Sequence, residues 1–305
     1  MGEIVTDKSN VYSHGKRTEY PDGSYKLICC SRPVFRVPGW EDHYADQRRE
    51  RNRLIDEHSI HNARTNRDLA ELGWEARAKR APSPENIQRA ARRASARVRD
   101  LALCNDFAWF VTLTLDAQKI DRYDVSAITK KLRTWLDNKV RRQGLKYILV
   151  PERHKDGALH FHGFINEAPG LVPSGTWDVP GHKKPIRPRS SRQAAEWAAL
   201  GPGMGYHEVF NWEAWPLGFS TAIRLYGEYR AAVGYVCKYI AKQTKDADGK
   251  IGGRWYYSGG ELREPTITYP DYAAQDLLQW TPDAYTFDIP EARLTFAMYS
   301  EAAGK

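Results

Sequence analysis

The stretch HKDGALHFHGFI, residues 154–165, decides the fold because it has the pattern of a buried strand that carries two histidines. Side chains alternate between the two faces of a strand, so His160 and His162 lie on the same face. The other face is apolar and carries Leu159, Phe161 and Ile165. Two imidazoles side by side on a strand can form half of a divalent metal site, although a histidine pair that only packs against a sheet has the same pattern.

A second strand is predicted immediately before this one. The run LKYILVPE, residues 145–152, is strand-like, and the pair Asp156-Gly157 is a turn signal between the two runs. We therefore expect a hairpin. Its loop has either three residues, 155–157 with glycine in the left-handed conformation, or only the two residues Asp156 and Gly157.

The length of this loop decides which side chain lies opposite the first histidine. With a three-residue loop, Glu152 lies directly opposite His160 and diagonal to His162, within side-chain reach. With a two-residue loop, Arg153 takes that place and the carboxylate turns to the other face. We favour the three-residue loop, because a cation at that position would oppose metal binding. The predicted metal ligands are then His160, His162 and Glu152.

The composition indicates a chain with a substantial core and an anionic partner. Hydrophobic residues make up 41% of the 305 residues. The formal charge of +8 and the ten tryptophans favour a nucleic acid as the partner. The four cysteines show no C-x-x-C spacing, so neither a zinc ribbon nor a disulfide scaffold is indicated.

The hydropathy pattern predicts a cytoplasmic protein that does not contact a membrane. The mean hydropathy is -0.66, and no apolar run approaches the length of a membrane span. The sequence MGEIVTDKSN at the N-terminus lacks the basic-then-apolar order of a signal peptide.

Two further core elements are predicted upstream of the hairpin. Residues 107–115 alternate with period two, which indicates a central strand. Its apolar face carries Phe107, Trp109, Val111, Leu113 and Leu115. Its other face carries Thr112 and Thr114, turned outward or toward a ligand. A helix follows, capped by Asp124 or Ser126 and ended by Gly144.

A helix predicted over residues 228–242 carries a second cluster of polar groups. Its apolar side, which we expect to pack on the sheet, holds Val233, Val236, Cys237 and Ile240. Its opposite side holds Tyr235, Lys238, Tyr239 and Lys242. A phenol has an unperturbed pKa of about 10, so it attacks a phosphodiester only where nearby charge is stabilised, as beside a divalent metal. An amphipathic helix with snorkelling side chains is the alternative interpretation.

The outer regions give weaker signals. A small hairpin is expected around Pro21-Asp22-Gly23, followed by basic helices with 14 Lys and Arg against 8 Asp and Glu between Arg48 and Asp100. The last of these helices, RAARRASARVRD, either presents a solvated face or tracks a phosphate backbone. Residues 166–205 are rich in Pro and Gly and indicate an insertion with one short hairpin.

The three blocks FVTLTL, ALHFHGF and YVCKYIAK, in this order, resemble the motifs of the HUH rolling-circle replication initiators, the Rep endonucleases of small plasmids and single-stranded DNA phages. The resemblance covers roughly residues 107–245. It implies that His160, His162 and Glu152 bind Mg²⁺ or Mn²⁺. It also implies that Tyr239 is the first nucleophile and that Tyr235 serves the closing strand transfer or assists. From its charge, Lys238 or Lys242 is expected to neutralise developing charge or to steady the DNA backbone.

The resemblance implies an α+β fold, an open antiparallel sheet of the ferredoxin or RRM type with helices on one face. We expect this core over residues 101–262, after a mostly helical basic extension over residues 1–100 and before a tail, residues 263–305, of unassigned role. Predicted contacts with DNA are Thr112, Thr114, Arg92, Arg93, Arg97, Lys130, Arg133, Arg254 and Trp255.

The implied function is to nick a single-stranded replication origin and to start rolling-circle replication from the free 3′-OH. No G-x-x-x-x-G-K-[ST] loop occurs, so unwinding is expected from a host helicase and synthesis from a host polymerase, in a bacterial cell with a plasmid, phage or integrated element. A relaxase or transposase with the same chemistry, and a non-catalytic nucleic-acid-binding protein, are the alternatives.

Overall fold

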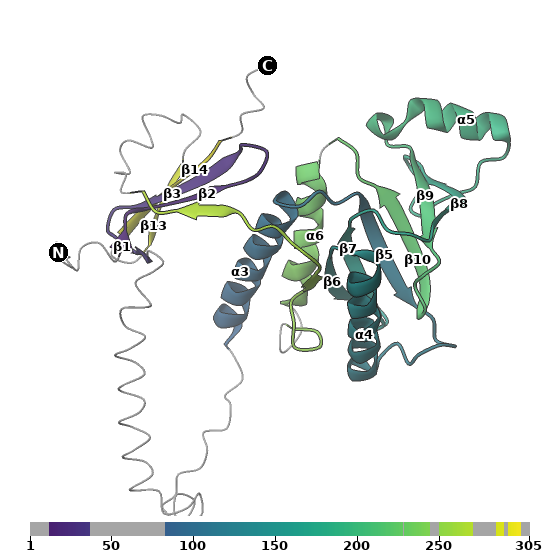
Figure 1. Ribbon diagram of the computed structural model, residues 1–305, viewed down its shortest axis with the longest axis horizontal. Coiled ribbons are helices and arrows are strands. Elements are labelled where there is room, and N and C mark those ends of the chain that lie inside the picture. The colour runs from purple at the N-terminus through teal and green to yellow at the C-terminus, as the bar shows by residue number, and fades with distance from the viewer. Residues whose placement is uncertain are drawn as a thin grey trace, which may run out of the picture. The chain divides into compact units, whose positions relative to one another are not determined.

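The structure, a computed structural model, describes residues 12–36, 83–227, 229–244, 250–270, 285–289 and 292–299. The chain divides into two compact units, one of residues 82–264 and the other of residues 1–81 and 265–305. Each unit has its own antiparallel sheet (Figure 1).

The larger unit is built on a seven-stranded sheet in the order β11-β6-β7-β5-β10-β9-β8, with every neighbouring pair antiparallel. The strands are β5 (Trp109–Leu115), β6 (Tyr147–Arg153), β7 (Leu159–Ile165), β8 (Leu171–Asp178), β9 (His207–Trp212), β10 (Gly218–Arg224) and β11 (Tyr257–Gly259). The helices are α3 (Pro84–Leu103), α4 (Val125–Gln143), α5 (Ser191–Leu200) and α6 (Tyr229–Gln243), with a 3₁₀ turn, η2 (Pro202–Met204). The predicted α+β architecture with an antiparallel sheet is thus confirmed.

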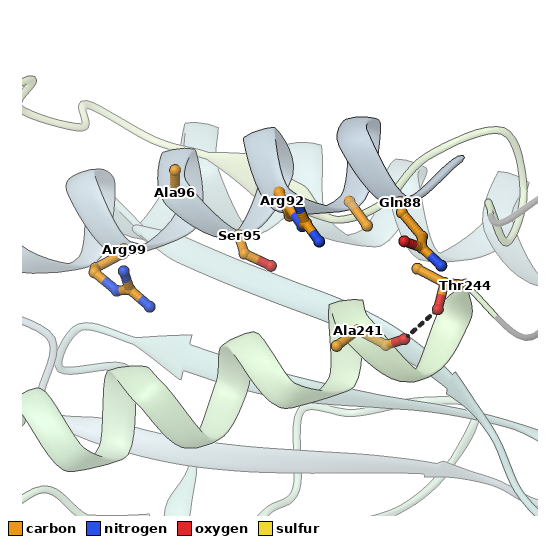
Figure 2. A pocket seen from close by; sticks show the side chains of 8 residues that line it. Gln88, Arg92, Ser95, Ala96, Arg99, Ala241 and Thr244 are labelled. Atoms are coloured by element: carbon orange, nitrogen blue, oxygen red, sulfur yellow. Dashed lines mark hydrogen bonds between the residues drawn. The ribbon is translucent and has the colours of Figure 1, made fainter. Parts of the chain in front are cut away.

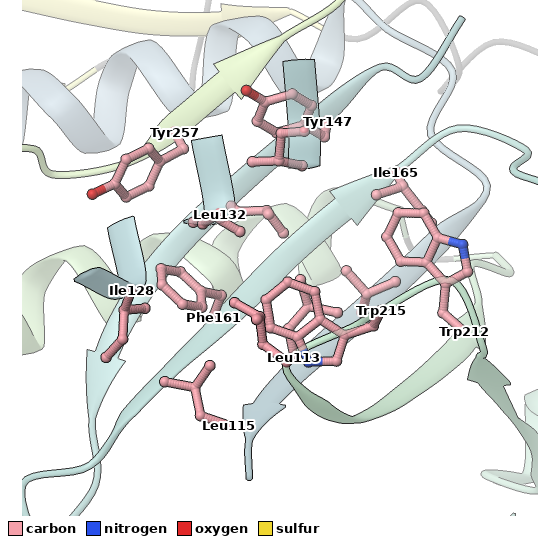
Figure 3. Close-up of a cluster of buried hydrophobic side chains, with 14 of the residues drawn as sticks. Leu113, Leu115, Ile128, Leu132, Tyr147, Phe161, Ile165, Trp212, Trp215 and Tyr257 are labelled. Carbon is pink, nitrogen blue, oxygen red and sulfur yellow. The ribbon is translucent and has the colours of Figure 1, made fainter. Parts of the chain in front are cut away.

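One face of this sheet packs against α4. Ile128, Leu132 and Leu136 of α4 are fully buried against the sheet, in a cluster that includes Leu113 and Phe161 (Figure 3). The helix begins and ends as its sequence predicts, because Asp124 accepts a hydrogen bond from the Ala127 amide and Gly144 closes the helix with a φ of 63°.

The other face packs against α6, and α6 in turn packs against α3. Val233, Val236 and Ile240 of α6 are buried between Val98 of α3 and Phe164 of β7. The expectation of helices on one face only is therefore wrong. The physical reason is that both faces of β7, and of most of β6, are buried, so each face of the sheet is covered by a helix.

The central strands approach each other closely at one glycine. A Cβ atom at Gly163 would lie 1.8 Å from the Ile148 carbonyl oxygen of β6, so no larger residue fits there without moving the strands. Gly163 directly follows His162. The close approach fixes the β6–β7 pairing beside the candidate site.

Three sequence-based assignments in this unit need correction. Phe107 precedes β5 and packs in the α3–α6 layer rather than with the face of Val111 and Leu113. The insertion holds β8 and α5 rather than one short hairpin. The expected boundary between residues 100 and 101 falls inside α3, and the whole helix belongs to the larger unit.

The smaller unit contains a five-stranded sheet in the order β12-β2-β3-β14-β13, with a separate β1–β4 pair. Its strands are β1 (Tyr12–Ser13), β2 (Gly15–Glu19), β3 (Tyr25–Cys30), β4 (Phe35–Arg36), β12 (Thr266–Thr268), β13 (Tyr285–Ile289) and β14 (Ala292–Tyr299). The predicted hairpin is the β2–β3 pair, with Gly23 at a φ of 79°. Three strands of this sheet come from the C-terminal tail. The helices predicted between residue 41 and α3 lie outside the described residues.

Within the described residues, no helix is both long enough and apolar enough to cross a membrane.

Candidate active site

The β6–β7 hairpin has the three-residue loop and the register that its sequence predicts. Gly157 has a φ of 86°, and the His154 amide donates to the Ala158 carbonyl at 2.9 Å. Glu152 is directly opposite His160. The predicted proximity of the carboxylate to His162 is confirmed, because Glu152 Oε2 lies 2.9 Å from His162 Nε2.

Each histidine is held by a threonine of the neighbouring strand β5. Thr112 Oγ1 lies 3.0 Å from His162 Nδ1, and Thr114 Oγ1 lies 3.2 Å from His160 Nδ1. A ring that donates from Nδ1 keeps the lone pair of Nε2 free for another partner, so these bonds orient the histidines as a second shell orients metal ligands. The two threonines therefore contact the predicted ligands themselves, a role that their alternating pattern alone did not reveal.

The charge state of the cluster follows from its surroundings. Burial, with a further contribution from the nearby His154 and His162, lowers the pKa of His160 to about 4. His160 is thus neutral at pH 7, the form that binds a metal. Burial alone would raise the pKa of Glu152, but the contacts with His162 and Lys242 outweigh it and hold that pKa at about 2.

A carboxylate suits Mg²⁺ or Mn²⁺, and neutral imidazoles are common ligands of divalent transition metals. His162 Nε2 is buried without a well-formed hydrogen bond in the described part of the chain, although it lies next to the Glu152 carboxylate. A cation would satisfy this atom. However, no three His, Cys, Asp or Glu side chains of the described residues converge closely enough to hold an ion in this conformation. Glu152 Oε1 instead bonds Lys242 Nζ at 2.7 Å.

The two tyrosines of α6 lie beside this cluster. The ring of Tyr239 stacks on the His162 ring, with centroids 4.2 Å apart and planes within 6°. Its hydroxyl donates to the Tyr235 hydroxyl at 2.6 Å. Tyr235 is 47% exposed, and its ring meets Phe110 of β5 edge-on. The structure thus brings both phenols and the histidine pair into one cluster.

The buried position of Tyr239 corrects the expectation that it lies on a polar side of α6, away from the sheet. The side chain is only 5% exposed because it fills the space between α6 and His162. Burial raises the pKa of Tyr239 well above its usual range, and the hydrogen bond to Tyr235 and the charge of Glu152 add to this effect. Tyr239 is therefore a neutral phenol in this conformation.

The two lysines of α6 have different surroundings. Lys242 bonds Glu152 and lies over the Tyr239 ring, with Nζ 4.7 Å from the ring centroid. Lys238 is exposed one turn earlier on the same helix. Lys242 is therefore the lysine that the structure brings to the cluster.

Several residues predicted to contact DNA lie away from the histidine cluster, are buried in the core or form an ion pair within the protein. Trp255 is 8% exposed and packs in the α3–α6 layer, so it is a core residue and not a free stacking surface. Arg97 forms a two-pronged ion pair with Glu264. Three exposed cations lie away from the histidine face, Lys130 and Arg133 on α4 and Arg254 before β11.

A cavity of about 460 Å³ lies between α3 and α6. Its lining includes Arg92, Ser95 and Arg99 from α3, with Ala241 of α6 and Thr244 directly after that helix (Figure 2). Within the described residues, neither arginine forms an ion pair. Arg93 is exposed on the same helix. This basic hollow agrees with the interpretation of α3 as a phosphate-contacting helix.

Two aromatic residues of the site were not singled out in the sequence. His154 lies on the hairpin with its ring centroid 3.5 Å from that of His160, and its signal was its position just before the turn. Phe110 touches both Tyr235 and His162, and its signal was its period-two spacing from Thr112.

Residues 108–244 match the family model described as replication-associated protein ORF2/G2P. This segment contains β5, the histidine strand and the tyrosine helix, so the resemblance to the Rep family of rolling-circle replication initiators is confirmed. The matched segment covers less than half of the chain. Comparisons with curated proteins and with solved structures give no match.

Proposed function

We propose that the protein is a metal-dependent, site-specific nickase and strand transferase that starts rolling-circle DNA replication. The observation that carries this proposal is the stack of Tyr239 on His162 at 4.2 Å, with Tyr235 bonded to Tyr239. Phenols and a histidine pair from distant parts of the chain meet at one point, as a tyrosine transesterification requires.

The reaction is a phosphodiester exchange without an external co-reactant. The phenolic oxygen of a tyrosine attacks the scissile phosphorus, the bond from phosphorus to the 3′ oxygen breaks, and the phenolic proton is balanced by the proton that the 3′ oxygen gains. The downstream strand is then linked through its 5′ phosphate to the tyrosine, and the upstream strand ends in a free 3′-OH. The reverse exchange rejoins the strand.

His160, His162 and Glu152 would hold the divalent cation, which supplies Lewis-acid polarisation of a phosphate oxygen and stabilises the leaving 3′ oxygen. Thr112 and Thr114 keep the two imidazoles in place for this task. Lys242 is close enough to the Tyr239 ring to neutralise charge that develops on the phenol or the phosphate. Its release from Glu152 would accompany binding of the ion by that carboxylate.

The two tyrosines suit alternating attack because their hydroxyl oxygens are 2.6 Å apart, so a phosphate near one lies near the other. Tyr239 as the first nucleophile stays a prediction. The exposure of 47% at Tyr235, against 5% at Tyr239, favours Tyr235 as the phenol that a strand meets first in this conformation. Single Tyr→Phe variants distinguish the two orders.

Arg92, Arg93 and Arg99 of α3 would hold the DNA backbone through phosphate contacts, which position DNA without reading its sequence. The chain would act in the bacterial cytoplasm with a host helicase that opens the duplex and a host polymerase that extends the 3′-OH.

The test uses single-stranded DNA with a randomised central segment, labelled at its 3′ end, together with Mn²⁺ and the full chain. The proposal predicts a labelled protein band that survives boiling in detergent, because the downstream fragment stays on the tyrosine. A label at the 5′ end should be released instead. A double variant, Tyr235→Phe with Tyr239→Phe, should form no adduct. An unchanged adduct in that variant would refute the assignment, and no adduct from the parent would favour a non-catalytic nucleic-acid-binding protein.

A further inference from the structure

A single row of side chains crosses the sheet from the histidines to an exposed phenylalanine. Glu152 of β6 is opposite His160 of β7, His160 is opposite Thr114 of β5, and Thr114 is opposite Phe219 of β10. Directly opposed residues of antiparallel strands point to the same face. Phe219 therefore lies on the face of the candidate active site, two strand spacings or about 10 Å from His160.

Phe219 is exposed although its strand is not at the edge of the sheet. β10 lies between β5 and β9, yet 67% of Phe219 is accessible to solvent. Of the strands, β6 and β7 supply the residues buried beneath α6, and no described residue of β10 belongs to that buried cluster. Ser220 and Ala222 follow Phe219 in β10 and lie on the opposite face; both are buried, Ala222 in the cluster that packs against α4. The register is thus fixed by the other face, and Phe219 cannot turn inward.

The neighbours of Phe219 form a surface of mixed aromatic and hydroxyl character. Thr221 lies two residues further along β10 on the same face and is opposite Thr112. Thr112, Thr114 and Thr221 are each half-buried on this face. An open antiparallel face with an exposed ring and hydroxyl groups suits an unpaired nucleotide, because every base offers a π face and the hydroxyls can bond sugar and phosphate oxygens.

We propose that Phe219 is a stacking subsite for an unpaired base that lies next to the phosphate at the histidine cluster. The ligand is single-stranded DNA, and the subsite makes the β5–β10 surface the track along which the strand reaches Tyr235. The proposal rests on the proposed function for the position of the phosphate, whereas the stacking itself does not require cleavage.

The binding test separates stacking from chemistry by using the full chain with Tyr235→Phe and Tyr239→Phe as the parent. Its affinity for a fluorescein-labelled 20-nucleotide oligo(dT) is measured by fluorescence anisotropy without added metal. Loss of one stacked base should raise Kd roughly 5- to 150-fold in Phe219→Ala. Phe219→Tyr, which keeps the ring, should bind close to the parent value. The matched control is Met204→Ala, since Met204 is also an exposed apolar residue, at 63%.

The location of the contact is tested by photocrosslinking with oligo(dT) that carries 5-iododeoxyuridine. The crosslinked peptide should contain residue 219, and Phe219→Ala should remove this product. Equal melting temperatures of parent and variant will show that the fold is intact, as expected for an exposed side chain. A Kd in Phe219→Ala equal to that of the parent, or a crosslink that persists in this variant at the same yield, would overturn the stacking subsite.

The two proposals fail in different ways. If the chain with native tyrosines forms no covalent adduct while Phe219→Ala still loses affinity for oligo(dT), the nickase is refuted and the subsite stands. If the adduct forms and Phe219→Ala changes neither its rate nor the affinity, the subsite is refuted and the nickase stands.

Discussion

Replacing Thr112 by valine tests whether the β5 threonines position the metal ligands. Valine has nearly the same shape, so Thr112→Val removes the 3.0 Å contact with His162 Nδ1 without opening a cavity. Loss of such a second-shell partner typically weakens metal binding about 10- to 100-fold. This corresponds to about 1.4–2.7 kcal/mol, within the range expected for leaving a buried polar atom unpaired.

The assay is a titration of the full chain with Mn²⁺, followed by calorimetry or by the electron paramagnetic resonance signal of the free ion. It therefore does not depend on DNA cleavage. Thr221→Val is the matched control, because Thr221 is opposite Thr112 on β10, where no histidine contact is found among the described residues. Thr112→Val should weaken Mn²⁺ binding and Thr221→Val should not. The positioning role would be refuted if neither variant bound Mn²⁺ more weakly than the unmodified chain. It would also be refuted if both variants lost the same affinity.

Three further changes have distinct expected outcomes. Asp124→Ala removes the cap of α4 and should lower the free energy of unfolding by about 1 kcal/mol, seen as a lower urea midpoint; an unchanged midpoint would contradict the capping role. Trp255→Ala should cost about 3–5 kcal/mol of stability, since the side chain is buried; a loss of DNA affinity with normal stability would restore its role in stacking. The double variant Arg92→Gln with Arg99→Gln should bind duplex DNA more weakly. In filter-binding or anisotropy titrations, the slope of the logarithm of the binding constant against the logarithm of the salt concentration should fall in magnitude by about 0.9 per lost phosphate contact. An unchanged slope would exclude the cavity as a phosphate site.

The parts of the site that the sequence predicted correctly are those set by local geometry. The turn at Gly157 lies only a few residues from both Glu152 and His160, so loop length alone fixes which side chains face each other. The same holds for α4, where Asp124 and Gly144 act on backbone groups within one turn of themselves.

The parts that the sequence did not predict depend on contacts between distant segments. The burial of Tyr239 follows from the packing of α6 onto β7, which a helical wheel cannot show. The exposure of Phe219 likewise depends on the position of α6, which packs on β6 and β7 but not on β10. In the smaller unit, β14 pairs with β3, although most of the chain separates the two strands in sequence. No local pattern in either strand predicts this pairing.

The measurement that tests the central claim most directly is peptide mapping of the covalent protein–DNA adduct by mass spectrometry. After nuclease digestion, the account predicts a nucleotide linked through a 5′ phosphate to the phenolic oxygen of Tyr235 or Tyr239, in amounts that depend on Mn²⁺ or Mg²⁺ and are lost in His162→Ala. An adduct on a residue outside α6, or a yield unaffected by His162→Ala and by removal of metal, would contradict it.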